Sequence, residues 1–313
     1  NCVEMDLAPA STEICLELVV CQTLLPTGPA SEGALAFQAS LEHVTRRAGA
    51  SRPFVHEVCS GANATDLNNL ARFRHRRTHA LLQHLRPWVS RGKRGRCVRI
   101  LALVEAGDSV WNEAPDVLGA QWLSLAGHGK VLLGTQTSCW LGNSCDPEEE
   151  KRFTLSSESP SRYLGLGMIG EVGPLLTAYD RMASLSNNFD AADSAYEMNV
   201  YAREAALTST AAIDQRQELF GSLLVTMPDG CPGKCSRQHY LRHYFCGCLT
   251  CADAPWSCRG NAGLDEELQG MFTVDSECRL VRAAAPLAAR PTLWHGNGPG
   301  KITLEQKMPE LSD

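Results

Sequence analysis

The sequence lacks a long hydrophobic run, an internal repeat and a strong excess of either charge, and only 6% of its residues are aromatic. No stretch approaches the roughly 18 uninterrupted apolar residues of a membrane-spanning helix, so we expect no membrane span. The formal net charge of -6 gives the chain no overall attraction to nucleic acid. Composition therefore indicates a globular, water-soluble protein.

The chain has 313 residues, enough for one large domain or two ordinary ones. It begins with Asn1, from which we expect a fragment or a processed form. We expect a mainly helical region over 1–129, a core over 130–258 and an extended tail over 259–313. Within the core, a helical insertion is expected over 181–235.

Local patterns predict several elements. The run LELVVCQTLL at 16–25 is a candidate strand or short helix, and VRILALVEAG at 98–107 is a second helix or a buried strand. Apolar residues at helical spacing predict a helix from Asp66 to Pro87. Short apolar runs over 130–180, broken by Gly, Pro and Ser, indicate strands joined by turns. The Ala-rich segment 190–220 reads as helix.

Basic residues are concentrated in one segment. Between Ala71 and Ile100 the sequence has ten Lys or Arg residues and no acidic residue, whereas 146–150 is an acidic cluster. One interpretation of segment 72–99 is a solvated helix face with its loop. The other is an anchoring surface for an acidic partner or RNA.

Fourteen cysteines are present, and three of them, Cys246, Cys248 and Cys251, fall within six residues. This C-x-C-x-x-C spacing is too tight for three independent disulfides and suits thiolates that converge on a metal. We therefore expect an intracellular reducing compartment, the cytoplasm or nucleus, with an organelle as the alternative. The sequon Asn63-Ala64-Thr65 argues in the other direction.

Three segments taken in order resemble one family. They are WLGNSCDP at 140–147, LTAYD at 176–180 and RQHYLRHYFCGCLTC at 237–251. Together they resemble the C-terminal half of a SET domain with its post-SET zinc site, nearest to the SET and MYND type of protein lysine methyltransferase. The resemblance covers about residues 130–258.

This resemblance implies an α+β fold of small irregular β-sheets, with a helical N-terminal region and a zinc-bound post-SET segment at 243–258. It implies S-adenosylmethionine as cofactor and a protein lysine as substrate. Tyr179 would take the catalytic position, and Gly142 and Asn143 would lie where the family contacts the cofactor. The implied Zn²⁺ ligands are Cys145, Cys246, Cys248 and Cys251, a closed structural site that contributes folding energy.

Two alternatives stay open. The family's Asn-His pair reads Gly142-Asn143 here, and no Gly-x-Gly segment opens the domain. A catalytically inactive, zinc-stabilised SET-like scaffold, or a subunit of a larger assembly that binds a partner protein, is therefore the second interpretation. The third is a zinc-ribbon nucleic-acid binder. Cys231, Cys235 and His243 are rival metal ligands.

Overall fold

The computed structural model describes part of the chain, and all structural statements refer to that part. The described residues are 13–21, 32–50, 52–57, 81–88, 97–105, 109–136, 163–185, 209–223, 272–276, 279–282 and 290–296.

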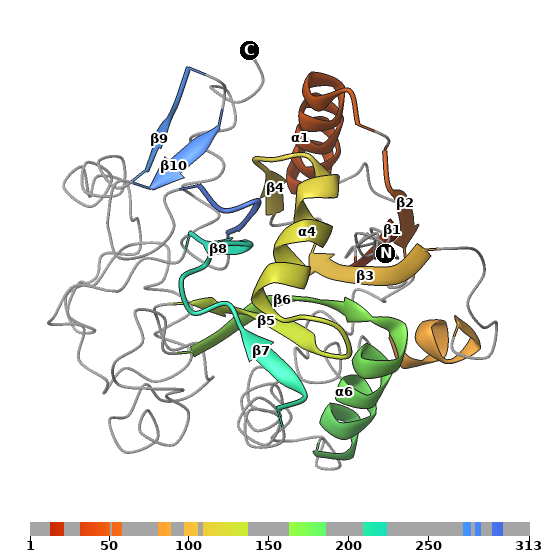
Figure 1. Cartoon of the computed structure of the whole chain (residues 1–313). Coiled ribbons are helices and arrows are strands. Elements are labelled where there is room, and N and C mark those ends of the chain that lie inside the picture. The colour runs from red at the N-terminus through yellow and green to blue at the C-terminus, as the bar shows by residue number, and fades with distance from the viewer. Residues whose placement is uncertain are drawn as a thin grey trace, which may run out of the picture.

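A six-stranded mixed sheet forms the centre of the described structure, in the order β2-β1-β3-β6-β5-β7 (Figure 1). Strand β1 pairs in parallel with both β2 and β3, β6 is antiparallel to β3 and to β5, and β7 is parallel to β5. The strands are β1 (Glu13–Cys21), β2 (Phe54–Glu57), β3 (Cys97–Glu105), β5 (Val131–Gln136), β6 (Tyr163–Glu171) and β7 (Ala211–Ile213).

Both faces of this sheet are covered, which explains why its strands are continuous apolar runs. Leu18 and Val20 of β1 belong to a buried cluster that includes side chains of the helices α1 (Glu32–Ala48) and α4 (Pro115–Leu125). Val19, between them, belongs to a second cluster with the helical residues 81–88 and with α6 (Val172–Leu185). We call these sides the α1/α4 face and the α6 face.

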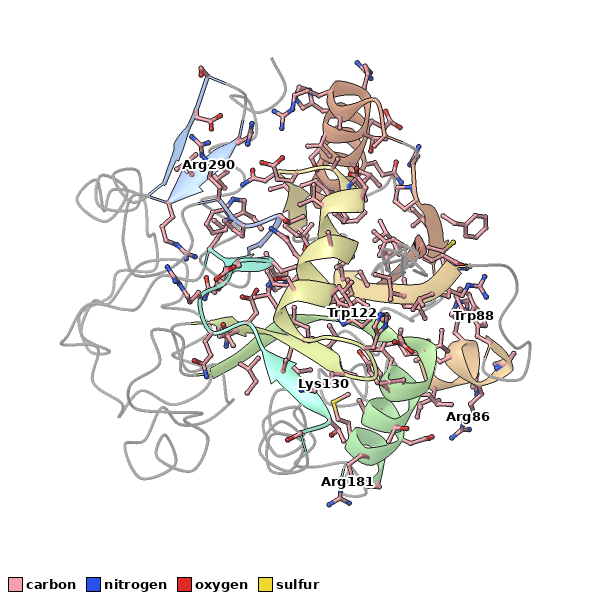
Figure 2. The ribbon with its side chains drawn as sticks, in the orientation of Figure 1. Arg86, Trp88, Trp122, Lys130, Arg181 and Arg290 are labelled. Carbon is pink, nitrogen blue, oxygen red and sulfur yellow. The ribbon has the colours of Figure 1, made fainter. Side chains whose placement is uncertain are left out.

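The helix boundaries follow from local chemistry. Gly49 has a φ of +62°, and the N–H groups of Gly49 and Ala50 donate to the carbonyls of Arg46 and Thr45 at 3.2 and 3.1 Å. This is the Schellman pattern, and it ends α1. Helix α4 begins with Pro115, whose missing N–H costs nothing at the first turn. Its Trp122 is fully buried against the sheet (Figure 2).

A smaller sheet has three strands in the order β4-β11-β8. Its side chains Trp111, Leu293 and Phe220 belong to the buried cluster on the α1/α4 face, which we call the α1/α4 cluster. Its strands are β4 (Ser109–Trp111), β8 (Phe220–Ser222) and β11 (Leu293–His295), and the hairpin of β9 (Phe272–Val274) and β10 (Leu280–Arg282) lies beyond it.

The α+β fold class is confirmed at this level. Strands β1 and β3 are the strand alternatives for 16–25 and 98–107. Within 130–180, β5 and β6 are strands as expected, but the expectation is wrong for 172–180, which belong to the helix α6. The helix expected over 190–220 is wrong for the described residues 209–220, because β7 pairs with β5 there. The large sheet takes strands from both sides of residue 129. The cysteine cluster at 243–258 and the tail beyond 296 lie outside the described residues.

None of the helices in the described ranges is long and apolar enough to cross a membrane.

Candidate functional site

The order of the parallel strands creates a switch point between β1 and β3. The chain passes from β1 through α1 to β2 on one side, and then returns to form β3 on the other side of β1. The last residues of the two strands, Cys21 and Glu105, are register partners, so both strands end level at one edge of the sheet. In open sheets with parallel strands, ligands bind outside the carboxyl ends of the strands at such a point.

Helix α1 begins at this edge. In a β-α-β unit with parallel strands, the helix runs back antiparallel to them, so Glu32 at its start lies on the carboxyl side of β1. Arg47, in the last turn, donates to the carbonyl of Asn112 at 3.3 Å, which fixes the opposite end of the helix beside β4. The amino-terminal N–H groups of α1 and its dipole therefore favour an anion at the edge.

A row of buried polar side chains lies beside the same edge. Only residues 106–108 separate β3 from β4, so Ser109 follows the carboxyl end of β3 directly. Ser109 is the register partner of His295 on β11, which in turn partners Ser222 on β8. Partners on neighbouring strands point to the same face. We call Ser109, His295 and Ser222 the polar row; all three are buried, at 1%, 5% and 6% exposure.

The polar row continues an apolar row. Two residues along each strand, on the same face, lie Trp111, Leu293 and Phe220, all within the α1/α4 cluster. The side chains thus change from apolar to polar toward the carboxyl end of β3. Within the described part of the chain, the hydroxyl oxygen Oγ of Ser109 has no hydrogen-bond partner. Burying a hydroxyl without a partner costs free energy, and such groups in native proteins call for a ligand or water.

Carboxylates follow β3 in the sequence. Glu105 is the last residue of the strand, and Asp108 directly precedes Ser109. Carboxylate oxygens are the ligands that Mg²⁺ and Mn²⁺ prefer. Among the described residues alone, no group of three or more His, Cys, Asp or Glu side chains is placed to hold a metal ion.

Ser222 of the polar row is held by Gln217 and Arg282. The Ser222 N–H donates to Gln217 Oε1 at 3.0 Å, and an Arg282 Nη donates to that oxygen at 2.6 Å and to the Ser222 carbonyl at 2.7 Å. The Arg282 guanidinium lies over the ring of Trp294 at 4.9 Å. Burial lowers the pKa of Arg282 to about 10.

The loop before β8 is organised by Asp214. Its carboxylate is buried and accepts three backbone N–H groups, from Glu218, Leu219 and Phe220, at 2.7, 2.8 and 2.9 Å. Burial raises the pKa of Asp214, and the three N–H donors oppose that rise. Gln217, at a φ of +56°, completes the turn and donates through Nε2 to the Thr135 carbonyl at 3.1 Å.

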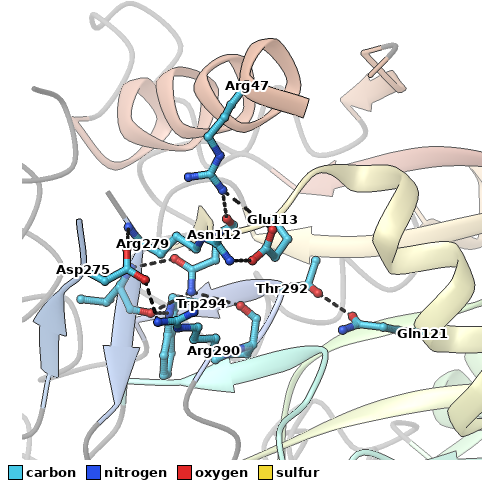
Figure 3. A network of polar contacts seen from close by, with 11 residues as sticks. Arg47, Asn112, Glu113, Gln121, Asp275, Arg279, Arg290, Thr292 and Trp294 are labelled. Carbon is cyan, nitrogen blue, oxygen red and sulfur yellow. Dashed lines mark hydrogen bonds and ion pairs between the residues drawn. The ribbon is translucent and has the colours of Figure 1, made fainter. Parts of the chain in front are cut away.

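A second network fixes β11 and β10 against β4 (Figure 3). The amide Nδ2 of Asn112 donates to the carbonyls of Leu280 and Pro291 at 2.8 and 3.1 Å, and its Oδ1 accepts the Leu280 N–H at 2.9 Å. Beside it, Glu113 forms ion pairs with Arg47 and with Arg279. The buried side-chain amide of Asn112, whose oxygen and nitrogen both have hydrogen-bond partners, therefore positions β11, the strand that carries His295.

The structure places Tyr179 on the α6 face, whereas the polar row continues the cluster on the α1/α4 face. Tyr179 lies in the third turn of α6, half-buried against the second cluster on the α6 face, and not at the end of a strand. The other expected site residues, Gly142, Asn143, Cys145, Cys246, Cys248 and Cys251, lie outside the described residues. The expectation that Zn²⁺ binds the four cysteines therefore stays a prediction without a structural test.

Sequence reasoning missed the polar row and did not single out the acidic residues of the segment that follows β3. One local signal was available: the acidic sequence Glu105-Ala106-Gly107-Asp108 follows a buried strand. The contributions of Ser222 and His295 had no such signal, because they come from strands more than a hundred residues further along the chain.

No family model matches this sequence, and no curated protein is similar to it. A solved structure described as a glycosyltransferase involved in the glycosylation of the major capsid of PBCV-1 is similar in fold, with a TM-score of 0.38 and 11% identity over 67% of this chain and 85% of that chain.

The resemblance to a SET-domain lysine methyltransferase is wrong, and with it the methyltransferase and the inactive SET-like scaffold. The largest sheet of the described residues instead contains a parallel β2-β1-β3 unit, and Tyr179 belongs to the helix α6.

Proposed function

We propose that this chain binds a nucleoside diphosphate sugar at the carboxyl edge of β1 and β3 and transfers the sugar to an acceptor hydroxyl. The observation that carries the proposal is the switch point, where Cys21 and Glu105 end two parallel strands level with each other. Nucleotides bind at this position in open sheets built from β-α-β units.

The surroundings of the edge suit a diphosphate. The amino terminus of α1 favours negative charge. The sequence has two acidic residues here, Glu105 at the end of β3 and Asp108 three residues later, and carboxylates are the ligand type that a divalent cation neutralising a diphosphate leaving group would need.

The polar row suits a sugar. A hydroxyl both donates and accepts hydrogen bonds, and a neutral imidazole does the same through its two nitrogens. Ser109, His295 and Ser222 present these groups side by side in a buried setting, and the hydroxyl of Ser109 is available for a ligand. Hydrogen bonds at a site shielded from water discriminate well between hydroxylated ligands and their analogues.

In such a transfer, the bond between the anomeric carbon and the diphosphate oxygen breaks as a bond from that carbon to the acceptor oxygen forms. The acceptor loses its proton to a base, and the nucleoside diphosphate leaves. The residues of this chain contribute positioning: the edge holds the diphosphate, and the polar row orients the sugar.

Calorimetric titration of the full chain with nucleoside diphosphates and their sugar esters, in the presence of Mn²⁺ or Mg²⁺, tests the proposal. We expect saturable, cation-dependent binding. The variant Ser109→Ala should bind the sugar nucleotide about tenfold more weakly, since the loss of one hydrogen bond costs about 1.4 kcal/mol. Its unfolding free energy should be equal to that of the wild type or higher, because the substitution removes an unsatisfied buried hydroxyl.

The matched control is Ser184→Ala, which removes an exposed hydroxyl from α6 and should leave binding unchanged. Absence of binding for every nucleoside diphosphate sugar at millimolar concentration would overturn the proposal. Equal affinity of the wild type and Ser109→Ala for the sugar nucleotide would show that the polar row is not part of the binding site.

A further inference from the structure

Cys15, on β1, is disulfide-bonded. It lies in the amino-terminal half of the strand and is the register partner of Arg99 on β3. Since alternate residues of a strand share a face, Cys15 lies on the same face as Glu17 and Val19, which is the α6 face.

On this face, the amino-terminal half of β1 and β3 carries mainly polar side chains, which pack against Trp88 of the helical residues 81–88. Toward the carboxyl ends, Val19, Leu101 and Leu103 are buried in the cluster under α6. Toward the amino ends, the corresponding positions are Cys15, Glu17 and Arg99.

A polar cluster takes the place of the apolar side chains there. The carboxylate of Glu17 accepts from Arg99 Nε and lies 2.6 Å from His56 Nε2. The Arg99 guanidinium stacks on Trp88 at 4.4 Å, and the His56 ring lies 4.4 Å from the same indole. Trp88 is buried, but the charged or polar side chains of Glu17, His56 and Arg99 are partly accessible to water, so their mutual interactions contribute less than a closed hydrophobic core would.

The strands that pair in this part of the sheet are separated by long segments of the sequence. Between β1 and β2 lie residues 22–53, and between β2 and β3 lie residues 58–96. Pairings between distant segments carry a large cost in chain entropy. A disulfide reduces the entropy cost of closing the segment that lies between its two cysteines, by restricting the unfolded chain.

We propose that this chain folds in an oxidising compartment, where the disulfide of Cys15 acts as the covalent staple of the amino-terminal half of β1. Its formation oxidises two thiols to one disulfide; the two electrons and two protons pass to a disulfide oxidant of that compartment, a protein disulfide or glutathione disulfide, which becomes a dithiol or two thiols. Reducing compartments keep such thiols free.

Two features of the sequence agree with this environment. Fourteen cysteines provide ample partners for oxidation, and Asn63-Ala64-Thr65 is an acceptor sequence for N-glycosylation, which occurs in the oxidising secretory pathway of eukaryotic cells. The expectation of a reducing compartment was based on the cysteine cluster at 246–251. The disulfide at Cys15 is the observation against it.

The direct test is a non-reducing peptide map of the full chain, secreted from eukaryotic cells and treated with N-ethylmaleimide before digestion. We expect the Cys15 peptide to be cross-linked to a second cysteine peptide and to appear free only after reduction. A glycan at Asn63 in the same material would be a second supporting result. An N-ethylmaleimide adduct on Cys15 in most of the molecules would overturn the proposal.

A thermodynamic comparison tests the staple itself. Under oxidising conditions, Cys15→Ser should lower the unfolding midpoint by several degrees relative to the wild type. After mild reduction of both proteins, the midpoints should agree within about one degree, because a serine and a free cysteine differ little in size. An equal difference under both conditions would show that Cys15 contributes only by packing, and would overturn the role of the disulfide.

Discussion

Cys21 and Glu105, the last residues of β1 and β3, lie directly opposite each other in the parallel sheet. This pairing brings together three features that are separated in the sequence: the start of α1, the acidic segment after β3 and the first residue of β4. The polar row extends from Ser109, the first residue of β4, across His295 of β11 to Ser222 of β8. The candidate site is therefore a consequence of strand order, and four substitutions and a pH series test how it is built.

Glu105→Gln should weaken cation-dependent binding of a nucleoside diphosphate at least about tenfold, because an amide is a poorer ligand for a divalent cation than a carboxylate. Titration with and without Mn²⁺ measures this. The matched control is Glu42→Gln on α1, where an exposed carboxylate lies 3.2 Å from Arg52. Loss of binding in the control, or undiminished binding by Glu105→Gln, would argue against a cation at the end of β3.

Asn112→Ala should lower the unfolding free energy by about 2–4 kcal/mol, because two carbonyls and one N–H lose their buried partner. Since this amide positions β11, affinity for the ligand should fall as well. Denaturant unfolding and titration measure the two effects. If stability falls and affinity does not, the polar row is not part of the binding site.

Gly221→Ala should be destabilising by about 1–3 kcal/mol or more, because a Cβ at this position would meet the ring of Trp294 at 2.6 and 2.7 Å and would also collide with Pro291. Thermal unfolding measures this. Gly173→Ala in α6 is the control, since a Cβ there meets nothing within 4 Å outside its two chain neighbours. Alanine favours the helix, whereas Pro174 directly after it disfavours helical backbone at this position, so we expect a smaller loss than for Gly221→Ala.

Asp214 should give the protein a specific pH dependence. Because burial raises its pKa in the folded state above the ordinary value of 3.8, the folded protein binds this proton more tightly than the unfolded chain. The contribution of Asp214 to stability is therefore largest at low pH, and it falls as the pH rises from about 3.8 through the raised pKa.

The variant Asp214→Asn lacks this titration and also places an amide NH₂ against backbone donors, so it should be less stable by about 1–3 kcal/mol at neutral pH. Its deficit relative to the wild type should be larger at acidic pH. Urea unfolding of both proteins from pH 3.5 to 7 measures the difference. A deficit that grows as the pH rises would contradict a raised pKa.

Tyr179→Phe should leave nucleotide binding unchanged and alter stability by no more than about 1 kcal/mol, because Tyr179 lies on the α6 face. Titration and unfolding measure the two quantities. A loss of nucleotide binding in this variant would indicate that the binding site lies on the α6 face of the sheet.

The elements of the sheet were partly predictable. The run around Leu18 and Val20 is apolar and rich in β-formers, and the strand alternative for 98–107 is correct. The segment with Tyr179 was expected to belong to the strands of 130–180, and the resemblance gave Tyr179 the catalytic position. Leu175, Ala178 and Met182 recur at helical spacing around it, and all three are buried on one side of α6.

The Ala-rich segment up to 220 was misread for a related reason. Ala211, Ala212 and Ile213 have helical or neutral propensity, but pairing with Val131, Leu132 and Leu133 of β5 makes them a strand. Tertiary context overrides local propensity in this case. The polar row was beyond single-sequence reasoning, because it depends on which distant strands become neighbours.

Hydrogen–deuterium exchange with and without a nucleoside diphosphate sugar and Mn²⁺ tests the central claim most directly, because it reports where on the chain a ligand binds. We predict that the ligand slows exchange at the first turn of α1, from the end of β3 through β4, and at β11. Slower exchange confined to α6, or no change at the end of β3 under saturating ligand, would contradict a binding site at the carboxyl edge of β1 and β3.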